Sequence, residues 1–181
     1  PAKKGDIEYE IRIGRTRKNV FEPGVSKEEF TKIKSYLDSE YPIYTGMRTP
    51  KFRMPETKEK ITYYNTGKRY LETLESDRPY PPVTDRKDRE GYPYDITLGP
   101  YTIRTTLARE NPDRITQYDR ADRVKVRMNN VYYNNDKGYS IFMRETLPDG
   151  PYEIEIELDP NYVGSAPNTS QERDNFYLPV M

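Results

Sequence analysis

The sequence contains no cysteine and no histidine among its 181 residues. Their absence removes thiolate nucleophiles, imidazole bases and Ser-His-Asp triads, and it excludes zinc sites built from Cys and His. Any metal ion must therefore be held by oxygen ligands, which suit hard cations such as Mg²⁺ and Mn²⁺. A disulfide framework is excluded as well, and we expect an intracellular, reducing compartment.

Long apolar runs and an excess of charge of one sign are absent too. No stretch approaches the roughly 18–20 apolar residues of a membrane span, so we expect no membrane partner. Lysine and arginine (30) balance aspartate and glutamate (30), and polyanion binding must therefore come from locally segregated charge. Tyrosine is abundant instead (18 residues) and supplies amphipathic bulk to a chain long enough for one domain with a core.

Two segments, at residues 7–13 and 152–158, alternate strictly between charged and apolar residues. The charged positions are Glu8, Glu10 and Arg12 in the first and Glu153, Glu155 and Glu157 in the second. A period of two predicts β-strands with an apolar stripe on one face and glutamates on the other. Like charges on one face repel each other, so the five carboxylates predict a divalent cation among them.

Other strands carry the opposite charge on their polar faces. The positions are Arg123, Lys125 and Arg127 on one strand, Arg104 on a second and Arg69 at the start of a third. Any one such strand is ordinarily a solvent-facing strand. Together, acidic and basic faces lining one cavity would suit phosphoryl transfer, in which a metal ion and cationic side chains neutralise the phosphates.

One helix and several further strands are predicted. Ser26 and Glu29 form a capping box ahead of a helix over residues 27–39. The strands are predicted at residues 61–65, 69–75, 94–98, 101–110, 122–128, 139–146 and 152–158, with hairpin turns at 65–68, 134–138 and 148–150. Residues 78–93, with four prolines, are predicted to be a surface loop.

Antiparallel strands with one charged face predict a mainly β (α+β) fold. We expect a closed antiparallel β-barrel tunnel of about eight strands, because closure removes sheet edges and a wide barrel holds a polar interior. The interior would be charged, at least one helix would flank the barrel, and the first and last strands would meet to close it. The tunnel domain is expected at residues 1–160, followed by a C-terminal extension at 161–181.

The Glu8-x-Glu10-x-Arg12-x-Gly14 opening and the Glu153-x-Glu155-x-Glu157 closing strand resemble the metal-binding signatures of the triphosphate tunnel metalloenzymes. Within that family the chain resembles the RNA 5′-triphosphatases of fungal and large-DNA-virus mRNA capping systems. The basic strand at 122–128 is similar to the strand with which that branch contacts phosphates. The segment 101–112 is similar to a family segment that carries an arginine and ends in Glu-x-Pro.

The resemblance implies roles for individual residues. The implied metal ligands are Glu8, Glu10, Glu153 and Glu155, and the implied catalytic residues are Glu157, as a further ligand or water-positioning base, with Lys125 and Arg127. The triphosphate would be bound by Arg12, Arg69, Lys87, Arg104, Arg123, Lys125 and Arg127, with Glu110 as a further site residue. The family's water-orienting Asp has no counterpart in residues 140–146, where Glu145 and Arg144 are the candidate replacements.

The implied reaction removes the γ-phosphate from the 5′-triphosphate end of nascent RNA, with Mg²⁺ or Mn²⁺ as cofactor and NTPs as further substrates with Mn²⁺. The chain would act with an RNA guanylyltransferase, in a virus-infected host cell or in a nucleus or cytoplasm. An inorganic tripolyphosphatase or other nucleotide-processing tunnel enzyme is one alternative. A non-catalytic RNA-binding β-protein, whose tyrosines stack on bases, is another. Whether the chain is free-standing or a domain of a larger capping protein is left open.

Overall fold

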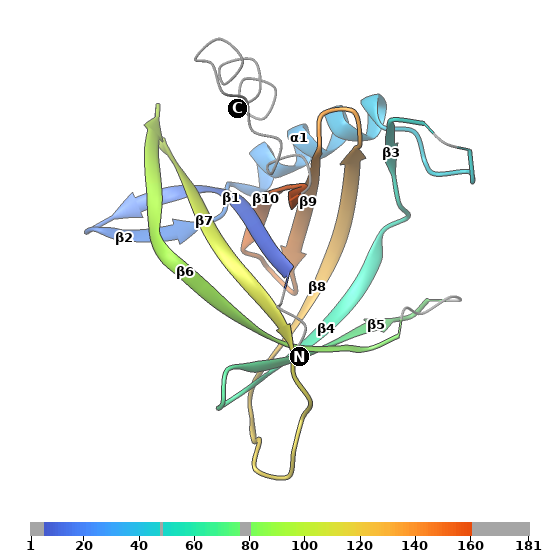
Figure 1. The fold of residues 1–181 in the computed structure, drawn as a ribbon. Helices are drawn as coiled ribbons and strands as arrows, with labels where there is room; N and C mark the ends of the chain where they lie inside the picture. Colours follow the sequence, from blue (N-terminus) through green and yellow to red (C-terminus); the bar gives the residue numbers. More distant parts are fainter. Residues whose placement is uncertain (1–5, 48, 77–80, 161–181) are drawn as a thin grey trace.

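The structure is a computed structural model that describes residues 6–47, 49–76 and 81–160, coloured along the chain in Figure 1. This part of the chain forms ten β-strands and one α-helix, and the predicted extension at 161–181 lies outside it. The elements are β1 (Asp6–Arg17), β2 (Val20–Pro23), α1 (Lys27–Glu40), β3 (Lys51–Arg53), β4 (Thr57–Tyr64), β5 (Lys68–Leu74), β6 (Val83–Leu98), β7 (Tyr101–Pro112), β8 (Ala121–Asn134), β9 (Tyr139–Thr146) and β10 (Tyr152–Leu158).

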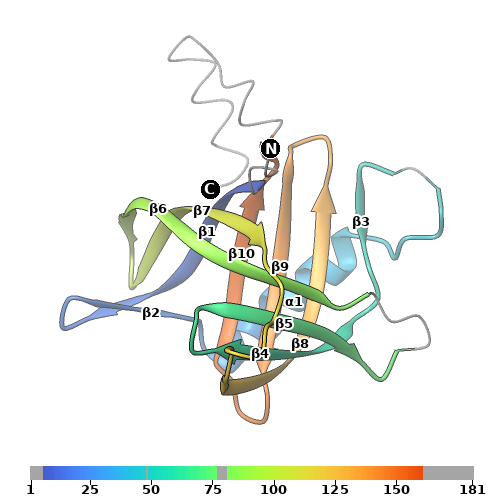
Figure 2. The same cartoon turned by 60° about the horizontal axis from the view of Figure 1, so that its bottom comes forward.

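Eight of these strands close into an antiparallel barrel (Figures 1 and 2). Their order is β10-β9-β8-β4-β5-β6-β7-β1, and β1 pairs back onto β10, with Ile11 opposite Ile156. The remaining two strands extend this ring, since β2 pairs with β1 and β3 with β8. The predicted barrel is therefore confirmed, and so is its closure by the first and last strands.

Helix α1 lies across the outer face of β8, β9 and β10, as Figure 2 shows. Its apolar residues Phe30 and Leu37 form the core with Tyr132, Met143 and Ile154, one from each of these three strands. Because this apolar face is covered by the helix, the charged face of the same strands is left to line the interior. The helix was predicted within one residue of its observed bounds.

The capping box that predicts the start of α1 is present. The backbone N–H of Glu29 donates to Ser26 Oγ at 3.1 Å, and the N–H of Ser26 donates to Glu29 Oε1 at 3.1 Å. At the other end of the helix, Asp38 accepts a 2.6 Å hydrogen bond from the Tyr132 hydroxyl on β8. The helix is thus fixed to the barrel wall by polar as well as apolar contacts. No helix in the described residues is long and apolar enough to cross a membrane.

The predicted loop at 78–93 is wrong from residue 83 onward, because β6 begins at Val83. Strand β6 pairs with β5 on one side and with β7 on the other. Its alternating charges belong to two faces of a strand, since Asp85 and Lys87 line the interior while Arg86 is exposed. Pro93, which suggested a loop, lies where the pairing with β7 shifts register between Glu90 and Tyr94.

The other predicted strands are present, with shifted ends. The three predicted hairpins are confirmed, since β4 pairs with β5, β8 with β9 and β9 with β10. Strand β4 begins earlier than predicted, at Thr57, and β8 runs on to Asn134. The short strands β2 and β3 were not predicted, because four and three residues are too few for an alternating pattern to be recognised.

Candidate active site

The barrel encloses a cavity of about 290 Å³ whose lining is mostly charged. All eight strands of the barrel, β1 and β4 to β10, contribute to this lining. The residues expected from the sequence that line it are Arg12, Arg69, Lys87, Glu110, Lys125, Arg127, Glu153, Glu155 and Glu157. The inward alternation of charge read from the sequence therefore does bring acidic and basic side chains into one space.

Three glutamates from the first and last strands form an acidic cluster. The carboxylates of Glu8, Glu10 and Glu157 each offer an oxygen within 4.8 Å of the others. The ladder explains this placement, because Glu10 lies directly opposite Glu157, and Glu8 shares the face of Glu10 on β1. Glu8 Oε2 and Glu10 Oε1 are buried, and both face the ammonium group of Lys87. This hard oxygen donor set fits Mg²⁺ or Mn²⁺, which Glu8, Glu10 and Glu157 would hold.

Glu153 and Glu155, expected as metal ligands, lie further back along β10 and face cations. Glu155 Oε2 accepts a 2.9 Å hydrogen bond from Arg144, and Glu153 Oε2 lies 3.5 Å from Lys125 Nζ. Of the three glutamates of β10, the acidic cluster therefore contains Glu157 and neither Glu153 nor Glu155. A ligand role for Glu153 and Glu155 stays a prediction.

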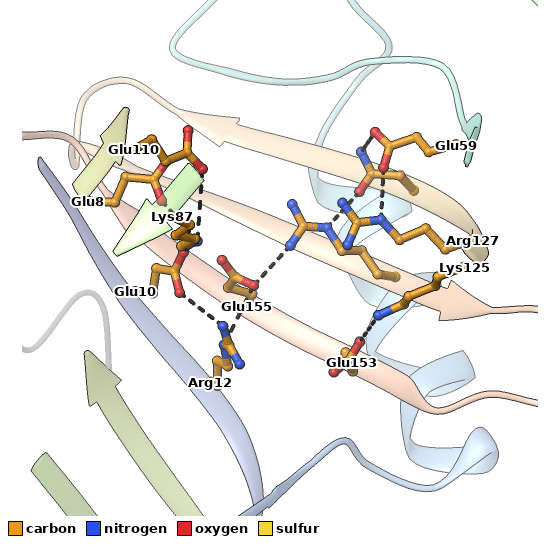
Figure 3. A network of polar contacts seen from close by, with 12 residues as sticks. Glu8, Glu10, Arg12, Glu59, Lys87, Glu110, Lys125, Arg127, Glu153 and Glu155 are labelled. Atoms are coloured by element: carbon orange, nitrogen blue, oxygen red, sulfur yellow. Dashed lines mark hydrogen bonds and ion pairs between the residues drawn. The ribbon is translucent and has the colours of Figure 1, made fainter. Parts of the chain in front are cut away.

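Lys87 lies against the acidic cluster, as Figure 3 shows. Its Nζ is 3.1 Å from Glu8 Oε2, 4.0 Å from Glu110 Oε1 and in direct contact with Glu10 Oε1. Glu10 is almost fully buried, with 1% of its side chain exposed, and so depends on this positive partner. A cation bound by these carboxylates shares them with Lys87, and the expected phosphate-binding role of Lys87 stays a prediction.

Crowding of carboxylates shifts their protonation. Burial, together with the charges of Glu8 and Glu155, raises the pKa of Glu157 to about 8. Burial and the neighbouring Glu8 raise the pKa of Glu110 to about 7. Because these shifts disfavour the charged form, Glu157 and Glu110 retain protons near neutral pH, and a cation bound at the acidic cluster would displace the proton of Glu157.

The opposite wall is cationic and comes from β8 and β9. Lys125, Arg127 and Arg144 line the cavity there. Arg127 Nε donates to Glu59 Oε2 at 2.8 Å, which fixes the guanidinium against β4. Arg144 and Glu145 were the two candidates for the missing Asp of the family. Arg144 lines the cavity and Glu145 does not.

Arg69 lines the cavity but is already tightly paired. Its Nε and Nη2 donate to the two carboxylate oxygens of Asp85, both at 2.8 Å, and Nη2 also donates to Glu110 at 3.1 Å. These contacts, which outweigh burial, raise the pKa of Arg69. Asp85 was not expected from the sequence because it lies in the segment interpreted as a loop.

Arg104 and Arg123, expected to bind phosphate, do not line this cavity. Arg104 donates two 2.9 Å hydrogen bonds to Asp95 and lies over the Phe21 ring, 4.5 Å from its centroid. Arg123 lies over the Tyr63 ring at 4.4 Å. Contact of either arginine with a bound phosphate chain stays a prediction.

No protein-family model and no curated protein matches this chain. Among solved structures, the RNA triphosphatase Pct1 of S. pombe superposes with a TM-score of 0.71 at 14% identity, over 99% of this chain and 81% of that one. Pct1 in complex with the Spt5 CTD gives a TM-score of 0.72 at 13% identity, with the same coverage. The Mimivirus capping enzyme triphosphatase matches at a TM-score of 0.49 and 14% identity, over 91% of this chain and 87% of that one. The likeness to Pct1 shows that the chain has the fold of that RNA triphosphatase, so the fold implied by the resemblance is confirmed.

Proposed function

We propose that the chain is a metal-dependent RNA 5′-triphosphatase that removes the γ-phosphate of nascent RNA in the first step of cap formation. The observation that carries this proposal is the pairing of an acidic and a basic wall in one cavity of the barrel. Glu157 of the acidic cluster lines one wall together with Lys87, which contacts Glu8 and Glu10, and Lys125 and Arg127 line the other. A triphosphate end needs both, because its transferred phosphoryl group is neutralised by a metal ion and by cationic side chains.

The residues divide the reaction between them. Mg²⁺ or Mn²⁺ at the acidic cluster would supply charge neutralisation for the reacting phosphate. Lys125 and Arg127 bind the phosphate oxygens and stabilise the charge that develops on them. Glu157 orients the attacking water and accepts its proton. The oxygen of this water bonds to the γ-phosphorus while the bond to the β–γ bridging oxygen breaks, which leaves inorganic phosphate and RNA with a 5′-diphosphate end.

The proposed product defines the partners. A 5′-diphosphate end is what a guanylyl-transfer reaction consumes, so the chain would act with an RNA guanylyltransferase in an intracellular, reducing compartment. The cavity lining recognises phosphate by charge, and nucleoside triphosphates would be further substrates with Mn²⁺. The same observation favours inorganic tripolyphosphate as the second candidate substrate. A non-catalytic role based on tyrosine stacking is less favoured, because exposed tyrosines lie on separate elements: Tyr36 on α1, Tyr92 on β6 and Tyr118 between β7 and β8.

Phosphate release from triphosphate-ended RNA, with and without Mn²⁺, tests the proposal. We expect Mn²⁺-dependent release that falls about 100-fold or more in Glu8→Gln, since one charge-stabilising group is removed. Glu72→Gln is the matched control, because Glu72 alternates with the cavity-lining Leu71 and faces the outside of β5. Equal rates in the two variants would overturn the proposal. A higher kcat/KM for tripolyphosphate than for RNA would mean that tripolyphosphate is the preferred substrate and that the same reaction takes place on it.

A further inference from the structure

Glu59 on β4 is a carboxylate that contacts two residues of β8 on the same face of the sheet and is not itself among the residues that line the cavity. Its Oε2 accepts from Arg127 Nε at 2.8 Å, and its Oε1 accepts from Asn129 Nδ2 at 3.1 Å. The register sets the first contact, because Glu59 lies directly opposite Arg127 in the β4–β8 ladder. Both oxygens of one carboxylate are thus used to hold neighbouring side chains (Figure 3).

The contact continues to the next strand. Asn129 Oδ1 accepts from Arg144 Nε at 3.3 Å, and Asn129 lies opposite Arg144 in the β8–β9 ladder. Arg144 Nη1 donates in turn to Glu155 Oε2 at 2.9 Å. Glu59 therefore orients Arg127 directly and Arg144 through the Asn129 amide, which accepts with its oxygen because its nitrogen donates to Glu59.

These contacts leave specific donors free. A guanidinium has five N–H groups in a fixed planar fork. Among the described residues, Arg127 uses its Nε–H on Glu59 and both of its terminal nitrogens remain available, and Arg144 keeps Nη2 after Nε and Nη1 are used. Both side chains line the cavity. The free nitrogens of the pair are therefore available to a group inside it.

The two guanidiniums also repel each other. Burial and the charge of Arg144 lower the pKa of Arg127, while the charge of Glu59 acts in the opposite direction. An anion between the two arginines would relieve this repulsion. Glu59 keeps the pair charged and close together without occupying the cavity itself.

We propose that Glu59 is a positioning residue that, with Asn129, aims Arg127 and Arg144 at one phosphate group of the substrate. This inference rests on the proposed function and adds Arg144 to the phosphate-binding set. A phosphate with several equatorial oxygens is the ligand that suits two convergent planar forks.

Glu59→Gln tests this role with nearly unchanged side-chain volume. Its amide nitrogen must face either Arg127 Nε–H or the Asn129 amide, so one of the two contacts is lost. We expect kcat/KM on triphosphate-ended RNA to fall about 10- to 100-fold, because misorientation of a group at the reacting phosphate is costly. Glu56→Gln is the matched control, since Glu56 accepts from Asn130 Nδ2 at 2.8 Å and is exposed outside the cavity.

A double-mutant cycle separates positioning from a merely structural role. If Glu59 acts partly through Arg127, then in an Arg127→Lys background the further change Glu59→Gln should lower kcat/KM by a smaller factor than it does in the wild-type background, and the remaining loss should come from Arg144. Losses that multiply fully in the double variant, or equal kcat/KM in Glu59→Gln and Glu56→Gln, would overturn the positioning role and leave the proposed function intact.

Metal-free binding of tripolyphosphate, measured by calorimetry, distinguishes failure of this inference from failure of the proposed function. We expect Glu59→Gln to weaken this binding about 10-fold relative to Glu56→Gln. If wild-type protein releases no phosphate from RNA but the two variants differ in tripolyphosphate binding as expected, the proposed reaction is wrong and the role of the arginine pair stands. If wild-type protein releases phosphate and the two variants bind tripolyphosphate alike, the proposed role of the arginine pair is wrong.

Discussion

At the scale of single residues, burial of the acidic cluster disfavours the charged form of its carboxylates. Glu157 has a pKa of about 8 in the folded protein against an ordinary value of 4.5. A raised carboxyl pKa means that the folded state binds the proton more tightly than the unfolded state. Its contribution to stability is fully present below pH 4.5 and is lost as the pH rises through about 8.

We therefore expect the thermal stability of the metal-free protein to fall as the pH rises from about 5 to 9. Glu157→Gln replaces the carboxyl by an uncharged group of the same shape, so it should flatten this fall and be more stable than wild type at the alkaline end. Differential scanning fluorimetry in a chelating buffer measures both effects. Glu22→Gln, at a side chain that is 59% exposed, should follow the wild-type curve. Identical slopes in wild type and Glu157→Gln would show that Glu157 is not the group responsible.

At the scale of elements, the contacts that stabilise the fold and the residues of the candidate site lie on opposite faces of the same strands. The helix buries Phe30 and Leu37 on the outside of β8, β9 and β10, while the charged residues of the same strands face the cavity. A change on the helix face should therefore alter the free energy of unfolding without changing the cavity.

Leu37→Ala should lower the free energy of unfolding by about 2–5 kcal/mol, because it leaves a cavity in the core. The kcat of the folded fraction should stay at the wild-type value. Urea unfolding and phosphate release, measured on the same preparations, check the two halves of this prediction. Ile33→Ala, at a position that is 37% exposed, should cost distinctly less stability. A large loss of kcat in folded Leu37→Ala protein would contradict the separation.

The elements best predicted from the sequence are those whose local signals agree. The capping box and helical spacing gave α1, and strict alternation at both ends gave β1 and β10 with their charged faces inward. β6 was missed because its prolines and alternating charges are also typical of an exposed loop. Only pairing with β5 and β7 distinguishes the two cases, and such non-local contacts leave no mark in the local sequence.

The sequence predicted an acidic cluster, but it did not predict which glutamate of β10 belongs to that cluster. Glu153, Glu155 and Glu157 are equivalent by alternation, and only the register of β1 on β10 places Glu157 opposite Glu10. A shift of two residues would keep every side chain on its face and change which glutamate joins the cluster. Glu59 was missed for a similar reason, since its partner Arg127 is 68 residues away along the chain.

At the scale of the whole molecule, the candidate site exists only in the closed barrel. Strand β1 is paired on both sides, with β7 and with β10, so residues from the two ends of the described chain meet at one wall. The formal net charge is zero, and the cavity cations Arg12, Arg69, Lys125 and Arg144 all face carboxylates. No net positive charge therefore steers a long RNA toward the barrel.

Substrate recognition should consequently be confined to the triphosphate end. We expect kcat/KM for triphosphate-ended RNAs of about 5 and about 25 nucleotides to agree within roughly threefold. The salt dependence should also be the same for both RNAs and for tripolyphosphate, because each backbone phosphate that is neutralised adds about 0.7 to the slope of log K against log salt for a single strand. Steady-state kinetics from about 50 to 200 mM salt provide the measurement. A steeper slope and a much higher kcat/KM for the longer RNA would mean that the outer surface binds the RNA backbone, and recognition would then extend beyond the cavity.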